Sequence, residues 1–227
     1  MNIAVVGGGA SGSLCAIMLA KKGHKVTLYE KNEKIGKKLY ITGKGRCNLT
    51  NATTGAEFLQ NVVSGNKFIM SAETRFNSSD TMELFKRFGV PLKIERGNRV
   101  FPVSDKSSDI IKALQEQLKL ARVNQKLGVT VQDIVIQDGT ACGVVVDGQT
   151  INHDAVVVAT GGKSYAPTGS TGDGYVWAQN SGHNIISPVP SLVGINVQDK
   201  DIFALEGLSL KNVTNTRNIS KNMESLL

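Results

Sequence analysis

Three glycines near the amino terminus follow a short apolar run and precede a stretch with helical spacing. The run covers residues 3–6, and the glycines are Gly7, Gly9 and Gly12. At this spacing the first glycine makes a tight turn, the second lets a phosphate approach the backbone, and the third lets a helix lie close on a strand. Ala10 and Ser11 open that helix, whose free N–H groups and positive dipole attract anions. The stretch predicts a binding site for a dinucleotide.

An acidic residue, Glu30, ends the second apolar run, which covers residues 26–29. Seventeen residues separate Gly12 from Glu30, and this distance suits a strand–helix–strand unit. A carboxylate at the tip of the second strand can accept hydrogen bonds from the hydroxyls of an adenosine ribose. Because an acid suits either ribose, FAD and NAD both remain open at this point. The simpler alternative is a strand–helix–strand unit with a purely structural role.

The chain is basic and large enough to bury a core. It has 227 residues, of which 41% are hydrophobic, and a net charge of +7. Basic residues gather just after the second run: Lys31, Lys34, Lys37, Lys38, Lys44 and Arg46. They lie on the side where the phosphates of a dinucleotide are expected, and no nucleic-acid motif is recognisable. We therefore interpret this charge as serving a cofactor and not a nucleic acid.

Cysteine content and targeting signals bear on the cellular compartment. The three cysteines have no metal-ligand spacing, and their odd number is typical of a reducing compartment. The apolar amino terminus lacks a basic leader region, and no run is long enough to cross a bilayer. We expect a cytoplasmic protein with no bound metal and no membrane partner. The sequence leaves the oligomeric state open.

Residues 34–51 form a second stretch suited to ligand binding. Gly36, Gly43 and Gly45 allow close approach of the backbone, while side chains such as Thr42 and Asn48 can form hydrogen bonds. The simpler alternative is a flexible basic loop, because glycine-rich loops are common.

Within this stretch residues 38–51, KLYITGKGRCNLTN, resemble the signature loop of a known family. This family comprises the bacterial NAD(P)/FAD-dependent oxidoreductases of the aminoacetone-oxidase-like type, which are relatives of the fumarate-reductase flavoproteins. In that family the loop runs along FAD toward the isoalloxazine. The resemblance implies that the cofactor is contacted by Lys38, Thr42, Gly45, Arg46, Cys47 and Asn48. For Cys47 we expect a small side chain packed against the flavin, and a thiol partly ionised beside Arg46 is the alternative.

Residues 123–151 read as short strands separated by two turns, Asp138-Gly139 and Asp147-Gly148. Both dipeptides are strong hairpin signals. The resemblance implies that a sheet strand precedes this small β-meander, and that the backbone of Val131 contacts adenine. His153 follows the meander and has no evident partner in the sequence.

Residues 155–162 combine an apolar run with the ending Ala159-Thr160-Gly161-Gly162. The run predicts a parallel strand buried on both faces, and the ending predicts a ligand site at the carboxyl edge of the sheet. Such an ending is typical of flavoproteins with two dinucleotide folds and moves the choice from NAD to FAD. Further on, Asp173 is placed to cap a helix over residues 174–181, and it is a second-choice neighbour of the cofactor.

These patterns predict an α/β protein with two regions. Residues 1–190 are expected to form a Rossmann-like FAD-binding domain with a parallel sheet, helices and a small β-meander. Residues 191–227 are expected to be the incomplete start of an inserted, β-rich substrate domain. Members of the resembled family are considerably longer, so we expect a truncated product or a second chain that supplies the rest.

Two functions follow from these expectations. The first is an FAD-dependent oxidoreductase that transfers hydride between flavin N5 and a small organic substrate, with NAD(P)H as a possible electron donor. The second is a truncated FAD-binding fragment without turnover. A basic nucleic-acid module is a third reading, with only the net charge in its favour. No arrangement of side chains in the sequence identifies a catalytic residue.

Overall fold

The computed structural model describes residues 1–190 of the chain. It consists of two units, residues 1–185 and residues from 186 onward, and the described part of the second unit forms no helix or strand. The predicted start of a substrate domain at 191–227 lies outside the described residues. The strands are β1 (Asn2–Val6), β2 (Lys25–Glu30), β3 (Thr50–Asn51), β4 (Leu92–Glu95), β5 (Arg99–Pro102), β6 (Asn124–Leu127), β7 (Val131–Gln137), β8 (Thr140–Val146), β9 (Gln149–Asn152) and β10 (Ala155–Val158).

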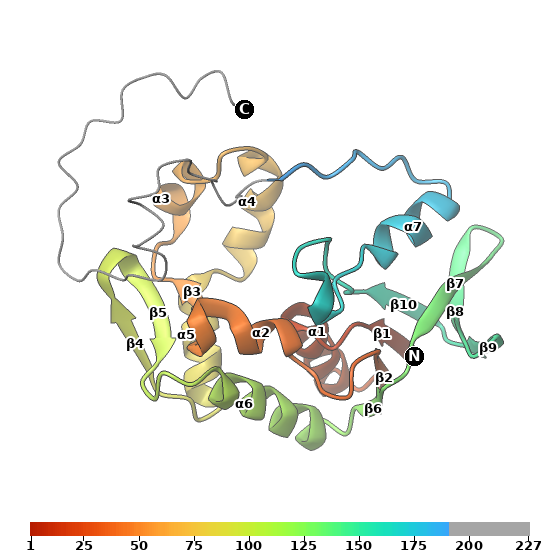
Figure 1. The fold of residues 1–227 in the computed structure, drawn as a ribbon, viewed down its shortest axis with the longest axis horizontal. Coiled ribbons are helices and arrows are strands. Elements are labelled where there is room, and N and C mark those ends of the chain that lie inside the picture. Colours follow the sequence, from red (N-terminus) through yellow and green to blue (C-terminus); the bar gives the residue numbers. More distant parts are fainter. Residues whose placement is uncertain (191–227) are drawn as a thin grey trace, which may run out of the picture. The chain divides into compact units, whose positions relative to one another are not determined.

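Helices alternate with these strands in the first unit (Figure 1). The α-helices are α1 (Ala10–Lys21), α2 (Lys37–Ile41), α3 (Gly55–Gln60), α4 (Asn66–Arg75), α5 (Ser78–Arg87), α6 (Ser107–Leu120) and α7 (Asp173–Asn180), and the short 3₁₀ helices are η1 (Thr42–Gly45), η2 (Arg96–Asn98) and η3 (Ala166–Thr168). The predicted α/β class with a Rossmann-like parallel sheet is confirmed.

A four-stranded parallel sheet in the order β10-β1-β2-β6 forms the centre of the first unit. Residues 3–6 of β1 are buried, and alternate side chains point to opposite faces. Val5 packs in a cluster with residues of α1 and α6, whereas Ala4 and Val6 pack with residues of β7, β8 and α7. The sheet therefore has helices on one face and the β-meander on the other.

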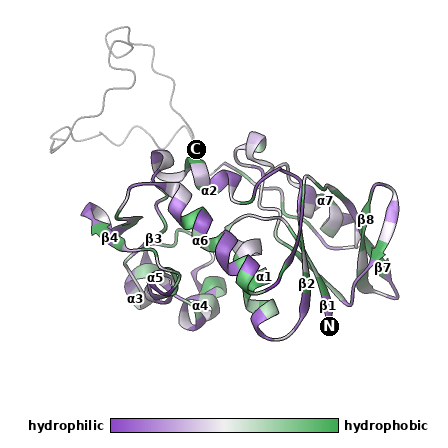
Figure 2. Cartoon of the chain, turned by 90° about the horizontal axis from the view of Figure 1, so that it is seen from below, coloured by the Kyte–Doolittle hydropathy of each residue, from purple (hydrophilic) through white to green (hydrophobic). Residues whose placement is uncertain are grey.

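On the helical face, amphipathic helices pack their apolar sides inward (Figure 2). In α6, Ile110, Leu114 and Leu118 are at most 2% exposed, while polar residues of the same helix face solvent. In α5, an Asn77 side chain accepts hydrogen bonds from the backbone N–H groups of Ser79 and Asp80, and Asp80 bonds back to Asn77 N. This capping box fixes the start of α5 at Asn77.

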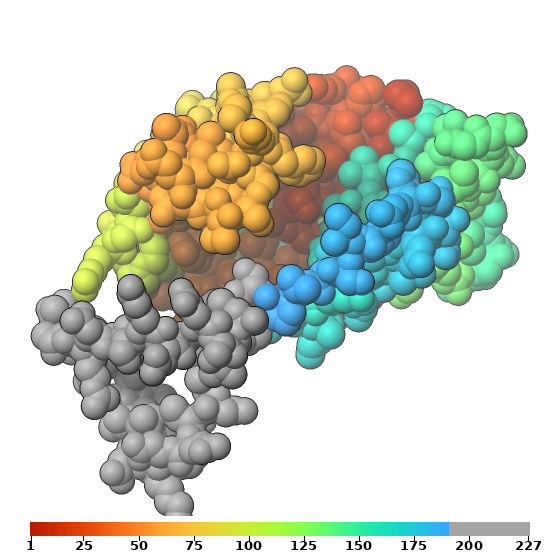
Figure 3. Space-filling model, turned by 90° about the horizontal axis from the view of Figure 1, so that it is seen from above, coloured from red at the N-terminus to blue at the C-terminus, as the bar shows by residue number. Residues whose placement is uncertain are grey.

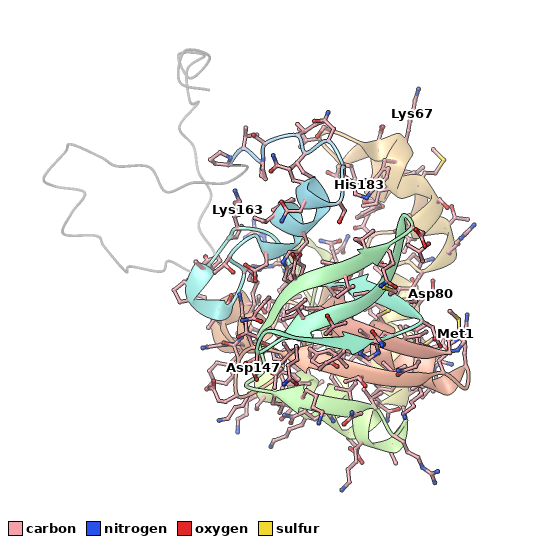
Figure 4. The ribbon with its side chains drawn as sticks, turned by 90° about the vertical axis from the view of Figure 1, so that its right-hand side faces the viewer. Met1, Lys67, Asp80, Asp147, Lys163 and His183 are labelled. Atoms are coloured by element: carbon pink, nitrogen blue, oxygen red, sulfur yellow. The ribbon has the colours of Figure 1, made fainter. Side chains whose placement is uncertain are left out.

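The other face carries the antiparallel sheet β7-β8-β9, which lies in front in Figure 4. The two predicted hairpins are confirmed, because Asp138-Gly139 joins β7 to β8 and Asp147-Gly148 joins β8 to β9. All four turn residues have positive φ, between 49° and 73°, as a tight hairpin turn of this kind requires. A third sheet, β3-β5-β4, contacts α5.

Strand β10 differs from its prediction. It is only partly buried, and Val158 is 45% exposed, because β10 forms an edge of the sheet within the described residues. Val156 and Val157 still contact the clusters on opposite faces, so the apolar run does face both layers. The sequence predicts correctly that β10 contacts both layers and wrongly that the strand is buried on both faces.

Candidate functional site

A pocket of about 330 Å³ lies at the carboxyl edge of the parallel sheet, where β1, β2 and β10 end. Ligands of open α/β sheets bind at this edge. Within the first unit, Figure 3 shows a hollow between the red to orange amino-terminal residues and the teal residues of the later sequence. The predicted site residues that line the pocket are Gly7, Gly9, Ala10, Ser11, Glu30, Lys31, Lys38, Thr42, Val131, Ala159, Thr160, Gly161 and Asp173.

The other predicted site residues do not line this pocket. They are Gly12, Gly45, Arg46, Cys47, Asn48 and Gly162. Gly12 has a packing role nearby, whereas residues 45–48 lead away toward β5. A contact between any of these side chains and a cofactor stays a prediction.

The three glycines of the amino-terminal turn have three different surroundings. Gly7 has a φ of +110°, and a Cβ atom there would collide with the backbone of Ala159. A Cβ atom on Gly12 would collide with the carbonyl oxygen of Gly7, so α1 can lie this close to β1 only without a side chain. A Cβ atom on Gly9 would meet nothing within 4 Å, although Gly9 lines the pocket. The turn therefore presents bare backbone to open space at its centre.

Helix α1 begins at this open backbone. Its N-cap residue is Gly9, no side chain of the described residues caps it, and its first turn has no acidic residue. The first N–H groups of a helix lack partners within the helix and carry the positive end of the dipole. Ala10 and Ser11 both line the pocket, so the helix start can receive an anion there.

Glu30 is fixed at the end of β2 by hydrogen bonds to its carboxylate. It accepts from Gly8 N at 2.7 Å, from Asn32 N at 2.8 Å and from Asn32 Nδ2 at 2.6 Å. The residue is 8% exposed, and it ties the glycine turn to the segment after β2. Its carboxylate is held in place at the pocket before any ligand arrives.

Lysines line the pocket across from a segment near α7. Lys31 Nζ donates to Thr171 Oγ1 at 2.7 Å and to Asp173 Oδ2 at 2.9 Å. Lys38 Nζ donates to Ser170 Oγ at 2.6 Å. Lys37 also lines the pocket, so the lining has three ammonium groups against the carboxylates of Glu30 and Asp173. This balance favours an anionic ligand.

Asp173 does not cap α7 as predicted. The N-cap residue is Gly172, with a φ of +89°, and Asp173 is the first residue of the helix. Burial raises the pKa of the Asp173 carboxyl, but hydrogen bonds from Lys31 and Thr171 outweigh this effect and hold the pKa below its ordinary value. Asp173 is therefore a charged partner of Lys31, a role that helix spacing does not reveal.

Aromatic side chains form part of the pocket wall beside Val131. Tyr29 is 3% exposed, and its hydroxyl lies 3.1 Å from His153 Nε2, with the rings edge to face. Burial raises the pKa of the Tyr29 hydroxyl and lowers the pKa of His153, so burial favours the neutral form of both groups. His153 has no evident partner in the sequence because Tyr29 lies 124 residues away along the chain. Trp177, held by a bond from Nε1 to Gln132 O at 3.0 Å, also lines the pocket.

Arg46 belongs to a cluster of charges outside the pocket, which we term the charge cluster: Arg46, Lys93, Glu95 and Asp105. Arg46 donates to Glu95 at 2.5 Å and to Asp105 at 2.6 Å, and its guanidinium lies 4.0 Å from the centre of the Phe101 ring. Lys93 donates to Asp105 at 2.7 Å. Hydrogen bonds from Arg46 and Lys93 hold the pKa values of Glu95 and Asp105 below their ordinary range.

Cys47 is buried in the core on the helical side of the sheet, at 1% exposure. Burial raises the pKa of its thiol, and this outweighs a hydrogen bond with Thr42 that lowers it. A raised pKa argues against a thiolate at this position. Of the two roles considered for Cys47, a small packed side chain agrees better with the structure.

Several pocket residues were not predicted, and some had a recognisable signal. Gly36 and Lys37 line the pocket and belong to stretches that the sequence singles out for ligand binding. The other additional lining residues are Val6, Tyr29, Asn32, Leu39, Val129, Thr130, Thr168, Gly169, Ser170 and Trp177. Many of them directly flank predicted ones. Thr168, Gly169 and Ser170 lie in a stretch rich in Gly, Ser and Thr just before α7, and such a stretch can make close backbone contacts.

Known proteins resemble the chain over most of its length. It is 35% identical over 209 residues to a 3-dehydro-bile acid delta(4,6)-reductase of Clostridium scindens, covering 87% of this chain and 48% of the relative. It is 27% identical over 228 residues to a ribosomal RNA dihydrouridine synthase of Escherichia coli, covering 98% of this chain and 56% of the relative. The chain thus spans about half the length of these curated relatives.

A solved structure and a family profile agree with these relatives. A flavocytochrome c3 fumarate reductase in its open conformation matches with a TM-score of 0.62 and 26% identity, over 79% of this chain and 40% of that one. The profile described as HI0933-like protein Rossmann domain matches residues 1–227. The chain therefore belongs to the HI0933-like family of Rossmann-domain flavoproteins, as the resemblance of residues 38–51 indicates.

Proposed function

We propose that this chain binds FAD, with the ADP half of the cofactor in the pocket. The observation that carries this proposal is Gly9, whose missing side chain leaves open space between two glycines that the fold requires. The pyrophosphate would lie there, against the start of α1. The ribose next to adenine would lie at the carboxylate of Glu30, which hydrogen bonds already hold in place.

The size and charge of the pocket fit this half of the cofactor. A volume of about 330 Å³ lies at the lower end of the range for small-molecule sites and suits part of a dinucleotide. Lys31, Lys37 and Lys38 would offset the two negative charges of the pyrophosphate. Tyr29, Val131 and Trp177 supply the apolar wall for adenine.

The proposed reaction is hydride transfer with a small organic substrate, as part of a longer oxidoreductase. Bound FAD supplies a hydride acceptor or donor at flavin N5. The residues of this chain would bind and orient the cofactor, and a reductase of a bile acid derivative among the relatives supports a small-molecule substrate. NAD(P)H is the proposed electron donor.

Two other outcomes compete with this proposal. The chain can bind FAD and yet lack turnover, because it spans about half of its relatives. Relatives named as ribosomal RNA dihydrouridine synthases, together with a net charge of +7, favour RNA as the alternative substrate class. Reduction assays with small-molecule acceptors and with ribosomal RNA separate these outcomes once FAD binding is established.

The first experiment is a visible absorption spectrum of the purified chain after FAD is added and the excess removed. We expect a retained flavin band that ADP displaces, because ADP would occupy the same pocket. FMN lacks the AMP part of FAD, with its adenine and adenosine ribose, and should not be retained. Retention of FMN, or FAD binding that ADP does not affect, would overturn the assignment of the pocket to the ADP half.

A further inference from the structure

The segment between η3 and α7 is attached across the pocket to the residues that follow β2. We term residues 168–173 the strap and residues 31–38 the basic loop. Asn32 Nδ2 donates to Thr168 O at 3.2 Å, and the bonds of Lys38 to Ser170 and of Lys31 to Thr171 and Asp173 complete the attachment. Partners in these bonds are 132 to 142 residues apart in sequence.

Two glycines let the strap lie close to its neighbours, Gly169 against the basic loop and Gly172 against Lys163. Gly169 has a φ of +101°, and a Cβ atom there would lie 2.9 Å from Asn32 Nδ2 and 3.2 Å from Lys31 Cε. Gly172 has a φ of +89°, and a Cβ atom there would lie 2.8 Å from Lys163 Cε. Both φ values strain any other residue, so the strap is shaped to lie against its neighbours.

The bonds of the strap can open to water without leaving a fully buried charge unpaired. Lys31 and Asp173 are 28% and 31% exposed in their side chains, so water can replace their contact. Lys38 donates to a neutral hydroxyl of the strap, and an ammonium group has further donors to offer. Lys31 and Lys38 can therefore donate to a diphosphate with a remaining N–H while their bonds to the strap stay in place.

We propose that the strap is a gate for the dinucleotide, and that Lys31 with Thr171 and Asp173 is its latch. The cofactor enters and leaves while the strap is detached from the basic loop. A latch of this kind slows association and dissociation together, and it changes affinity little. The proposal rests on the proposed function, since the gated ligand is FAD.

Thr171 allows the cleanest test, because it belongs to the latch and does not line the pocket. Thr171→Val keeps the shape and charge of the side chain but removes its bonds to Lys31 and Asp173. We expect the association and dissociation rate constants for FAD to rise together by about fivefold or more, because two hydrogen bonds of the latch are lost, with Kd within about twofold. Thr150→Val, on the exposed strand β9, is the matched control.

Stopped-flow fluorescence of Trp177, the single tryptophan of the chain, reports binding at the pocket wall without a need for turnover. A rise in the dissociation rate constant alone would make Thr171 part of a stabilising contact and overturn the gate. Unchanged rate constants would also overturn it. Asp173→Asn should show a larger joint rise of the two rate constants. High salt should make the difference between this variant and the unsubstituted chain smaller.

A measurement without FAD separates failure of the gate from failure of the proposed function. Amide hydrogen exchange of peptides that contain the strap should be faster in Thr171→Val, while peptides from β1 and α6 stay unchanged. Equal exchange of the strap in both proteins would overturn the latch, whatever FAD does. If the strap loosens but no FAD binds to either protein, the proposed function fails and the gate for FAD fails with it.

Discussion

The glycine turn at residues 7–12 and the segment at residues 45–48 were both expected to contact a cofactor, yet only the turn opens on the pocket. The turn presents backbone to the pocket, and its glycine spacing dictates which backbone groups are bare. At residues 46–48 the expected contacts depend on side chains, and neighbours distant in sequence decide where Arg46 points. Spacing thus predicts backbone sites better than it predicts the direction of a charged side chain.

The steric requirement of the glycine turn can be tested at Gly12. A Cβ atom there would collide with the carbonyl oxygen of Gly7, which is a backbone atom and cannot move aside as a flexible side chain can. Gly12→Ala should lower the free energy of unfolding by about 3 kcal/mol and abolish FAD retention. Urea denaturation followed by circular dichroism measures the first effect. A midpoint equal to that of the unsubstituted chain would show that α1 can move away from β1 without cost.

The polar side of the turn can be tested at Glu30. Glu30→Gln replaces one carboxylate oxygen by an amide NH₂, which cannot accept a hydrogen bond. The remaining oxygen can serve either Gly8 or Asn32 but not both, so one of these bonds is lost. We expect a loss of about 2 kcal/mol in unfolding free energy and about tenfold weaker FAD binding. Glu33→Gln, nearby and exposed, is the control for loss of charge. Equal FAD affinities for the two variants would separate Glu30 from the site.

Arg46 tests the segment at residues 45–48 directly. Arg46→Met removes the bonds to Glu95 and Asp105 and should leave the affinity for ADP within about twofold, because Arg46 does not line the pocket. If the family resemblance also holds for the flavin end, the affinity for FAD should fall while that for ADP does not. Isothermal titration with both ligands measures the difference. Weaker ADP binding would contradict the placement of Arg46 outside the pocket.

The smallest expected effect concerns pH. The pKa values of Glu95 and Asp105 are lowered, so the stabilising contribution of the charge cluster is full above the ordinary carboxyl pKa and is lost as the pH falls through the lowered values. The urea midpoint should therefore fall more steeply in the unsubstituted chain than in a Glu95→Gln, Asp105→Asn double variant between about pH 5 and pH 2. Parallel curves would show that the cluster contributes nothing to stability.

The sequence predicted those parts of the fold that local chemistry determines. Alternating strands and helices, the glycine turn and both aspartate–glycine hairpins follow from spacing and from turn residues. Helical spacing also placed a helix after Gly172, but it did not show that Asp173 pairs with Lys31. Such partners lie more than a hundred residues apart, and residue type alone does not encode which of many charges they meet.

The same limit explains the site residues that were missed. Tyr29 and His153 form a buried pair across 124 residues, and each looked ordinary in its local sequence. Arg46 was attributed to the flavin through a resemblance of residues 38–51, whereas carboxylates on the β4–β5 side bind it in this structure.

Within residues 1–190, no helix has the length and apolar character of a membrane span.

The most direct test of the central claim is an FAD titration of Gly9→Ala beside the unsubstituted chain. Gly9 has a φ of −76°, and an added Cβ atom meets nothing within 4 Å, so the variant should unfold at the same urea concentration. The methyl group would occupy the space assigned to the pyrophosphate, and we predict FAD binding weaker by about tenfold or more. Equal FAD affinity in the two proteins would contradict the claim that the dinucleotide binds against this turn.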